Sequence, residues 1–210
     1  MTDPLILHED PISGNCYKIR LTASLLGISL ERRTYDIRNG ETRSPEFLRS
    51  INANGRIPVL QIGDRFLPES NAACYWLAEG SDLIPSDRFD HAEMLRWLFF
   101  EQYSHEPNIA TLRFWLAYIG KDNLDDTQLG QINSKTRSGQ EALRVMDAHL
   151  VQRDWFAGTG LSIADIALFA YTHVAEEGAI FSLDDHPAIC RWMARISDEP
   201  GFVPMKPGDH

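Results

Sequence analysis

The chain has 210 residues, of which 43% are hydrophobic and 24% charged, which is typical of a globular protein with one or two domains and a core that needs no disulfides. Its net charge of −10 repels nucleic-acid phosphates, so we expect no nucleic-acid partner. The sequence has no apolar run near the roughly 18 residues of a membrane span, no secretory signal pattern at its start and three widely spaced cysteines, which together favour a cytoplasmic protein with no membrane partner.

Strand and helix patterns alternate through the first eighty residues. Short apolar runs bounded by turn residues indicate strands, while serine caps and glycine stops indicate helix ends. The expected strands are 5–7, 30–35, 59–62 and 65–67, and the expected helices run up to residue 27, from 44 to about 54, and from 70 to 77. This order gives a parallel strand pair followed by an antiparallel hairpin. It is the order of an α+β thioredoxin-like domain, which we expect over residues 1–80.

Residues 81–88 form the expected linker, and the remainder, 89–210, is expected to be an all-α helical bundle domain. An aromatic-rich segment predicts a helix at 91–103. Apolar or small residues spaced three and four apart from Leu129 to Leu150 predict one face of a long helix packed in a bundle. Ser162 and Asp165 form a capping box before a helix that is apolar nearly all round, and is therefore expected to be central and buried. A last helix is expected at 186–196.

The loop after the first strand carries the first chemical signal. Ser13 to Cys16 keep the spacing of a C-x-x-C redox pair, but a serine in the first position cannot form its disulfide. The Ser13 hydroxyl and the partial positive charge of the helix N-terminus can instead stabilise a thiolate that a ligand supplies. Two alternatives stay open. Ser13 can be only a helix cap, and Cys16 can be a nucleophile for peroxidase-like or disulfide-exchange chemistry instead of a packed residue of the first turn.

Two further motifs suggest a site that reads a peptide. Pro58 opens a strand, where proline is often cis in a tight turn, and this would leave the main chain of Ile57 free to pair with a peptide-like ligand. Ser70, at a helix start, offers its hydroxyl and main-chain N–H groups to a carboxylate, and Glu69 can hold an ammonium group.

Other side chains could complete such a site. Arg43 and Arg56 are candidate anchors for a carboxylate. The aromatic residues of the second half are mostly core by default, but some could line an apolar cavity. The histidines form no pair with metal-ligand spacing and have no cysteine nearby, so no metal site is expected.

In their order and spacing, the serine-led loop, the Ile-Pro-Val-Leu strand start, the Glu-Ser helix start and the S-x-x-D box resemble the glutathione transferase family over essentially the whole chain. The resemblance implies a homodimer with glutathione as co-substrate in the first domain and an apolar electrophile beside it. The electrophile pocket is expected to include Phe100, Tyr103, Phe114 and Trp115. The implied reaction is conjugation, in which the glutathione thiolate attacks the electrophile.

The resemblance also implies individual roles. Ser13 matches the serine that activates the glutathione thiol, and the first strand lacks the tyrosine of the tyrosine-type classes. The main chain of Ile57 matches the group that pairs with the cysteinyl part. Glu69 and Ser70 match the pair that grips the γ-glutamyl end, and Arg56, with Arg43, lies where the family places groups near the glycyl carboxylate.

The same loop leaves alternatives within the family. Ser13-Gly14-Asn15 also resembles a bacterial Thr-x-Asn class linked to disulfide reduction, so Asn15 is a second candidate for contact with the sulfur. Glutathione-dependent disulfide or peroxide reduction is therefore one alternative function. A non-catalytic binding protein is another, although the presence of Ser13, Glu69 and Ser70 weighs against loss of the site.

Overall fold

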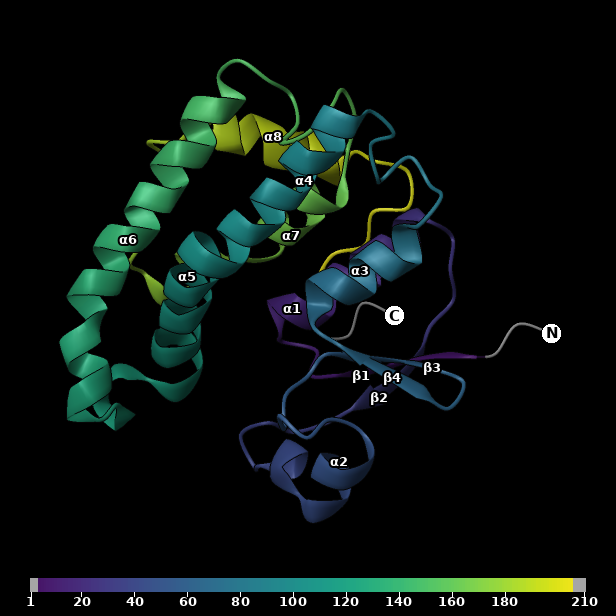
Figure 1. Cartoon of the computed structure of the whole chain (residues 1–210). Helices are drawn as coiled ribbons and strands as arrows, with labels where there is room; N and C mark the ends of the chain where they lie inside the picture. Colours follow the sequence, from purple (N-terminus) through teal and green to yellow (C-terminus); the bar gives the residue numbers. More distant parts are fainter. Residues whose placement is uncertain (1–3, 206–210) are drawn as a thin grey trace. The chain divides into compact units, whose positions relative to one another are not determined.

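A computed structural model describes residues 4–205 of the chain. By internal contacts the chain divides into two compact units, one formed by Met1–Ser81 with Glu199–His210 and one by Asp82–Asp198. The first is an α+β thioredoxin-like unit and the second is entirely helical within the described residues, which confirms the predicted fold class (Figure 1). None of the helices in residues 4–205 is long and apolar enough to cross a membrane.

A four-stranded sheet forms the centre of the first unit. Its strands are β1 (Leu5–Glu9), β2 (Glu31–Thr34), β3 (Val59–Ile62) and β4 (Arg65–Pro68), in the spatial order β2-β1-β3-β4. β1 pairs with β2 in parallel, whereas β3 pairs antiparallel with both β1 and β4. The predicted parallel pair and hairpin are therefore both present. They could be predicted because the turn residues around each strand are local signals.

The helices of this unit flank the sheet. α1 (Gly14–Leu25) and α3 (Ser70–Ala78) lie on one side of it, and the short α2 (Pro45–Ser50) lies on the other, preceded by the 3₁₀ turn η1 (Glu41–Arg43) (Figure 1). α2 ends well before the predicted residue 54. The Asn52 side chain accepts the main-chain N–H of Asn54 and donates to the carbonyl of Arg56 at 2.9 Å, a local turn that competes with further helix.

The last described residues differ from the predicted boundary of the second domain, because residues 199–205 belong to the first unit. The Tyr17 hydroxyl donates to the Val203 carbonyl and the Ser24 hydroxyl to the Gly201 carbonyl, each at 2.7 Å. Gly201 has a φ of +88° and a side chain there would lie 2.9 Å from the Ser24 carbonyl oxygen, so this close approach requires glycine.

The second unit contains the remaining helices. These are α4 (Arg88–Phe100), η2 (Glu101–His105), α5 (Glu106–Arg113), η3 (Phe114–Ile119), η4 (Lys121–Asn123), α6 (Asp126–Leu150), α7 (Ile163–Thr172), η5 (Ala175–Gly178) and α8 (Pro187–Ser197). The predicted helix at 91–103 is longer than expected, since α4 continues into α5 through the π-helical segment η2, and η3 is a second π segment. π segments leave no clear residue pattern, and they often accompany functional sites.

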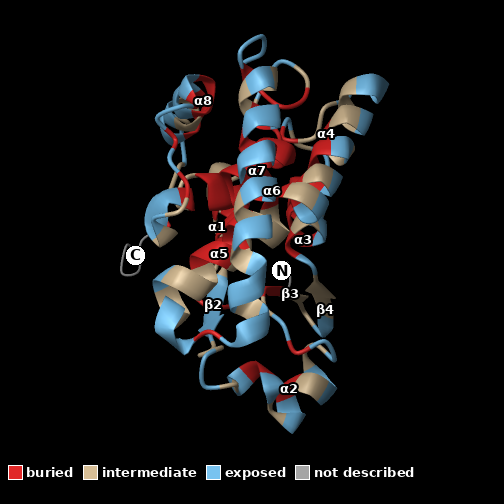
Figure 2. Cartoon of the chain, turned by 90° about the vertical axis from the view of Figure 1, so that its left-hand side faces the viewer, coloured by how far each residue is buried: buried red, intermediate tan, exposed pale blue. Residues whose placement is uncertain are grey.

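The predicted central helix is α7, all ten of whose residues are buried (Figure 2). The predicted capping box is present, with Asp165 accepting from the Ser162 main-chain N–H at 3.0 Å. The same carboxylate accepts from the main-chain N–H of Phe156 and from the indole N–H of Trp192. Asp165 thus connects the loop before α7, α7 itself and α8.

Candidate functional site

The predicted serine lies where β1 leads into α1. Ser13 is half-buried and is the N-cap of α1, with its Oγ accepting the main-chain N–H of Cys16 at 3.4 Å. Ser13 is therefore a helix cap, as one of the two alternatives predicted. The same hydroxyl hydrogen can still be donated to an acceptor outside the helix, since a serine oxygen accepts and donates at once. The positive end of α1 acts at this position as well.

Cys16 is fully buried in the first turn of α1. Burial raises the pKa of its thiol to about 12, although hydrogen bonds from the Ser13 side chain and the Asp10 backbone act in the opposite direction. A thiol with this pKa is neutral near pH 7 and is a poor nucleophile. The structure therefore disfavours Cys16 as the reactive group and favours its packed alternative.

Glu69 and Ser70 open α3 in an unusual way. Glu69 is exposed and has a φ of +71°, one of two positive φ values among the non-glycine residues of the described chain. Such a backbone costs about 1–3 kcal/mol and is typical of ligand-binding positions. Ser70, the first residue of α3, is buried. The backbone thus holds the Glu69 side chain outside the helix while the hydroxyl of Ser70 lies at its N-terminus.

A hydrogen bond joins the serine-led loop to the start of α3. The Ser70 hydroxyl donates to Oδ1 of Asn15 at 3.3 Å, and Asn15 belongs to the first turn of α1. The first turns of α1 and α3 therefore meet at Asn15 and Ser70. Both helix ends carry partial positive charge, so this place suits an anionic ligand.

Sequence reasoning missed a buried lysine at the same place. Lys18 lies on α1, is fully buried, and donates from Nζ to Ser70 Oγ at 3.5 Å and to Asn71 Oδ1 at 3.3 Å. Lysine is almost never fully buried unless it is paired. The available signal was the position of Lys18 directly before the apolar Ile19. In a helix that packs against other elements, a charge at such a position interrupts the apolar pattern.

The Ile57–Pro58 peptide bond is cis, as predicted. Ile57 is half-buried and Pro58 is buried at the start of β3. Arg56 is exposed, and its carbonyl accepts the side chain of Asn52.

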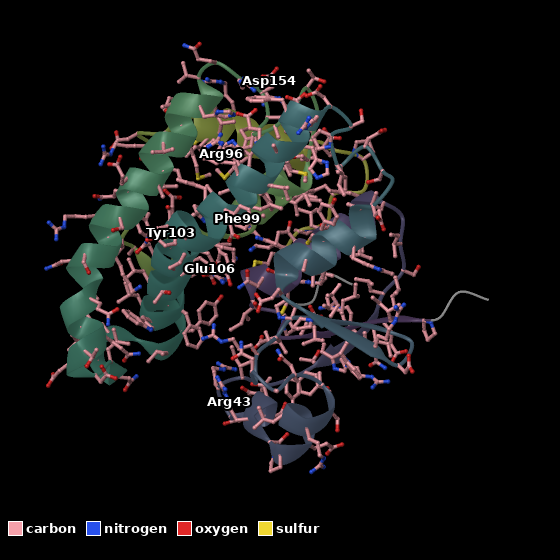
Figure 3. The ribbon with its side chains drawn as sticks, in the orientation of Figure 1. Arg43, Arg96, Phe99, Tyr103, Glu106 and Asp154 are labelled. Carbon is pink, nitrogen blue, oxygen red and sulfur yellow. The ribbon has the colours of Figure 1, made fainter. Side chains whose placement is uncertain are left out.

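Arg43 is also exposed and has a structural contact of its own (Figure 3). Its Nη1 donates to the Asn54 carbonyl at 3.0 Å, and a side chain on Gly55 would lie 2.7 Å from that same nitrogen. Arg43 thereby supports the loop that precedes the cis bond. The guanidinium has five N–H donors, so this bond uses only part of its capacity.

The four residues of the predicted electrophile pocket lie in the second unit. Phe100 packs edge-on against Trp97, and Phe114 stacks on Tyr118. Trp115 lies beneath the ammonium of Lys135. Tyr103 is 87% exposed, so it is not part of the core of this unit. Phe100, Phe114 and Trp115 thus contact different neighbours. These contacts do not test the electrophile pocket, which stays a prediction.

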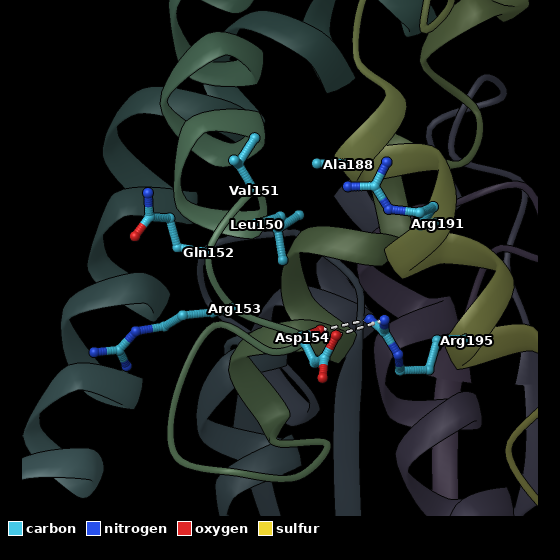
Figure 4. Close-up of a pocket in the computed structure, with 8 residues that line it drawn as sticks. All are labelled: Leu150, Val151, Gln152, Arg153, Asp154, Ala188, Arg191 and Arg195. Atoms are coloured by element: carbon cyan, nitrogen blue, oxygen red, sulfur yellow. Dashed lines mark hydrogen bonds and ion pairs between the residues drawn. The ribbon is translucent and has the colours of Figure 1, made fainter.

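A hollow of about 280 Å³ is present between the end of α6 and α8 (Figure 4). Arg195 in its wall pairs with Asp154 at 2.7 Å, and Arg153 pairs with Glu93 at 3.0 Å. Two of its arginines thus already hold carboxylates of the protein. This hollow contains none of the predicted site residues.

Comparison with known proteins gives consistent matches. The family model described as the N-terminal domain of glutathione S-transferase matches residues 4–79, and that for its C-terminal domain matches residues 114–200. Glutathione S-transferase F10 of Arabidopsis thaliana is 29% identical over 201 residues, which cover 91% of this chain and 92% of the relative.

Solved structures match over nearly the whole chain. A glutathione S-transferase from Pseudomonas fluorescens is 42% identical with a TM-score of 0.89, covering 97% of this chain and 99% of the other. A glutathione transferase from Pseudomonas putida, with one glutathione disulfide bound per subunit, is 26% identical with a TM-score of 0.82, covering 95% and 89%.

Proposed function

Because the chain belongs to the glutathione transferase family, we propose that it binds glutathione in its thioredoxin-like unit and transfers it to an apolar electrophile. The observation that carries the proposal is the hydrogen bond between Ser70 and Asn15. It supports the proposal because Asn15, a candidate for contact with the sulfur, and Ser70, a proposed partner of the γ-glutamyl end, lie within hydrogen-bond distance of each other. The glutathione disulfide in the Pseudomonas putida relative supports the same ligand class.

The chemistry requires the glutathione thiol to be ionised near neutral pH. Lowering a thiol pKa from about 8.5 by two units needs roughly 2.7 kcal/mol of preference for the thiolate. A hydrogen bond from the Ser13 hydroxyl and the N-terminus of α1 can supply this amount. The thiolate sulfur then bonds to the electrophilic carbon, and the leaving group departs with its bonding pair. The protein contributes thiolate stabilisation and proximity and forms no covalent intermediate.

The remaining residues hold the two ends of glutathione. The exposed Glu69 carboxylate pairs with the γ-glutamyl ammonium, and Ser70 with the α3 N-terminus takes the γ-glutamyl α-carboxylate. The main chain of Ile57 pairs with the cysteinyl part. Arg56 and the unused donors of Arg43 are the proposed partners of the glycyl carboxylate.

A second candidate reaction is glutathione-dependent disulfide reduction, with peroxide reduction as its variant. Two observations favour it. Asn15 lies in the same helix turn as Ser13 and is only half-buried, and the Pseudomonas putida relative holds the disulfide form of glutathione. In this reaction the amide of Asn15, in place of Ser13, donates to the sulfur.

Calorimetry and an activity panel test the proposal. Mixing the protein with glutathione should release or absorb measurable heat, and an absence of binding would rule out both reactions. Turnover should then be compared for an aryl halide, an organic peroxide and a mixed disulfide. Fastest turnover of the aryl halide supports conjugation, whereas turnover of only the disulfide supports the reductase alternative. Binding without turnover of any of the three supports a non-catalytic binding protein.

Glu69→Ala and Ser70→Ala should weaken glutathione binding more than they slow the reaction of bound glutathione. Each removes a polar partner of the γ-glutamyl end, and a hydrogen bond to a charged group contributes about 1.5–3 kcal/mol. The expected rise in the dissociation constant is thus about ten- to a hundredfold. Titration calorimetry gives this constant, and kcat at saturating glutathione gives the turnover. Equal losses in both quantities would contradict a pure binding role.

We also propose that the protein is a cytoplasmic homodimer that detoxifies electrophiles. Its three free cysteines suit a reducing compartment. Phe99 and Tyr103 are 72% and 87% exposed, and Arg96 and Glu106 lie on either side of them along α4 and α5 (Figure 3). Exposed aromatic side chains of this size mark interaction surfaces. Across a two-fold axis such an interface is self-complementary, so the exposed aromatic side chains of one subunit would lie against the same surface of its partner.

Phe99→Glu and Tyr103→Glu should therefore each weaken the dimer, because each would bury a charge without a partner in the interface. Light scattering at several protein concentrations measures the molecular mass. A wild-type monomer at all concentrations would rule out the dimer, and an unchanged dimer in both single variants would place the interface elsewhere.

A further inference from the structure

A buried cluster of ion pairs joins β1, β2 and α1, and the proposed function does not use it. Its anion is Glu9, the last residue of β1, which is fully buried. Two cations pair with this carboxylate, Arg20 of α1 at 3.2 Å and Arg32 of β2. A buried ion pair often adds less stability than apolar residues of similar volume. The position that the cluster fixes is therefore a second reason for its presence.

The two arginines differ in their contact with the loop that leads to Ser13. Arg20 donates from Nη2 to the main-chain carbonyl of Pro11 at 3.1 Å. Its side chain is only 10% exposed, so solvent screens this bond and the ion pair little. The Arg32 side chain is 30% exposed, and within residues 4–205 its guanidinium donates to Glu9 only. Arg20 therefore connects the buried carboxylate to the loop, whereas Arg32 does not.

The loop itself is tightly folded around Asp10. The Asp10 carboxylate accepts the main-chain N–H of Ile12 at 3.1 Å, and the Asp10 carbonyl accepts that of Ser13 at 3.0 Å. Pro11 has no main-chain N–H, so its carbonyl is its one main-chain group that can form a hydrogen bond. Arg20 takes this carbonyl from the side of α1. The backbone is thus held two residues before Ser13.

We propose that Arg20 is a positioning residue for Ser13, and that Glu9 fixes the direction of the Arg20 side chain. The inference rests on the proposed function and adds two residues to it. Arg20 holds the backbone that directs the Ser13 hydroxyl at the glutathione sulfur, and it acts through this loop only. A displacement of a catalytic donor by about 1 Å can slow a reaction about a hundredfold. The partners of the two ends of glutathione are not displaced.

The test measures conjugation of an aryl halide and glutathione binding in Arg20→Met. At saturating glutathione, kcat should fall by about ten- to a hundredfold. The pH dependence of kcat should show a raised pKa of the bound thiol, because the Ser13 hydroxyl no longer points at the thiolate. The dissociation constant of glutathione, from calorimetry, should change by less than about threefold. A merely structural role would lower the amount of folded enzyme without moving the thiol pKa.

Two variants provide the controls within the same cluster. Arg32→Met removes the other cation of Glu9 without touching the loop, and should leave kcat and the thiol pKa within about twofold of wild type. Arg20→Lys keeps the charge but lacks the planar fork of the guanidinium. It should change kcat and the thiol pKa in the same direction as Arg20→Met, and it serves if the methionine variant does not fold. Thermal unfolding checks that each variant is folded.

Glu9→Gln separates positioning from a direct effect of charge on the sulfur. If Glu9 fixes Arg20, its loss frees the Arg20 side chain, and the pKa of the bound thiol should rise. If the cluster acted only through its charge, the loss of a negative charge would favour the thiolate, and the same pKa would fall. The two accounts thus predict opposite signs for one measured quantity.

The outcomes distinguish this inference from the proposed function. If the wild type conjugates glutathione and both Arg20 variants keep its thiol pKa, the inference is wrong and the function stands. Equal losses in Arg20→Met and Arg32→Met, or a lowered thiol pKa in Glu9→Gln, also overturn the inference and leave the function intact. If the wild type does not bind glutathione, the proposed function fails, and the inference fails with it.

Discussion

Asp165→Asn should lower the free energy of unfolding by about 3 kcal/mol or more. The Asp165 carboxylate is buried and accepts four hydrogen bonds, from Phe156 N, Ser162 N, Ser162 Oγ and Trp192 Nε1, at 2.7–3.0 Å. An asparagine amide can accept at its oxygen alone, and its NH₂ group would face donors. Buried donors left unsatisfied carry the main cost. Urea unfolding followed by tryptophan fluorescence measures the loss.

The effect of this substitution should depend on pH. Burial raises the pKa of Asp165 to about 6, against the opposing effect of its hydrogen bonds. Between the ordinary carboxyl pKa of 3.8 and about 6, the folded protein holds a proton that the unfolded chain releases. This contribution to stability is full below the ordinary pKa and is lost as the pH rises through about 6. From about pH 7 to about pH 5.5, the gap between wild type and Asp165→Asn should widen by about 1 kcal/mol.

A matched control is Asp125→Asn, because Asp125 forms the capping box of α6 and accepts the main-chain N–H of Gln128 at 2.8 Å. This carboxylate is exposed, so its loss should cost about 1 kcal/mol or less. If Asp165→Asn costs no more than Asp125→Asn, the network around Asp165 does not hold α7 and α8 together as argued.

The two capping boxes, at Asp165 and at Asp125, show which features of the fold can be predicted from the sequence. The box at Ser162 and Asp165 was predicted because its residues are three apart and precede an apolar run. β3 and the start of α3 were predicted to the residue for the same reason, since proline, glycine and serine act on the adjacent backbone. The box at Asp125 follows the same rule, but it was not recognised, so α6 begins at Asp126 and not at Leu129. Local signals therefore predicted most of the fold.

The parts that could not be predicted depend on residues distant in the sequence. Lys18 donates to Ser70 and Asn71, and no local pattern connects these two residues to α1. Buried Glu9, at the end of β1, likewise pairs with Arg20 and Arg32. Charged residues of these types are usually on the surface, so residue type predicts that they are exposed, whereas the structure buries them. The start of α3 at Ser70 was predicted, but the burial of Lys18 and Glu9 was not.

Ser13→Ala should reduce kcat/KM for conjugation by about ten- to a thousandfold, the range for the loss of one preorganised donor to a developing or ionised charge. Without the hydroxyl, the thiol of bound glutathione should have a higher pKa, because the thiolate loses a charge-assisted hydrogen bond. The pH dependence of kcat at saturating glutathione reports this pKa directly. Glutathione affinity should change less, since the two ends of the tripeptide keep their partners.

Three variants separate the sulfur role of Ser13 from its capping role. Ser44→Ala removes the matched cap of α2, where Ser44 accepts the main-chain N–H of Phe47 at 3.3 Å, and should reduce stability by about 1 kcal/mol without reducing turnover. Cys16→Ser should leave conjugation intact, because the buried thiol is neutral at the working pH. Asn15→Ala tests the amide as the sulfur donor. If Asn15→Ala abolishes activity while Ser13→Ala retains the wild-type rate and pH profile, the thiolate is held by the amide, and the disulfide-reductase alternative becomes the better account of this site.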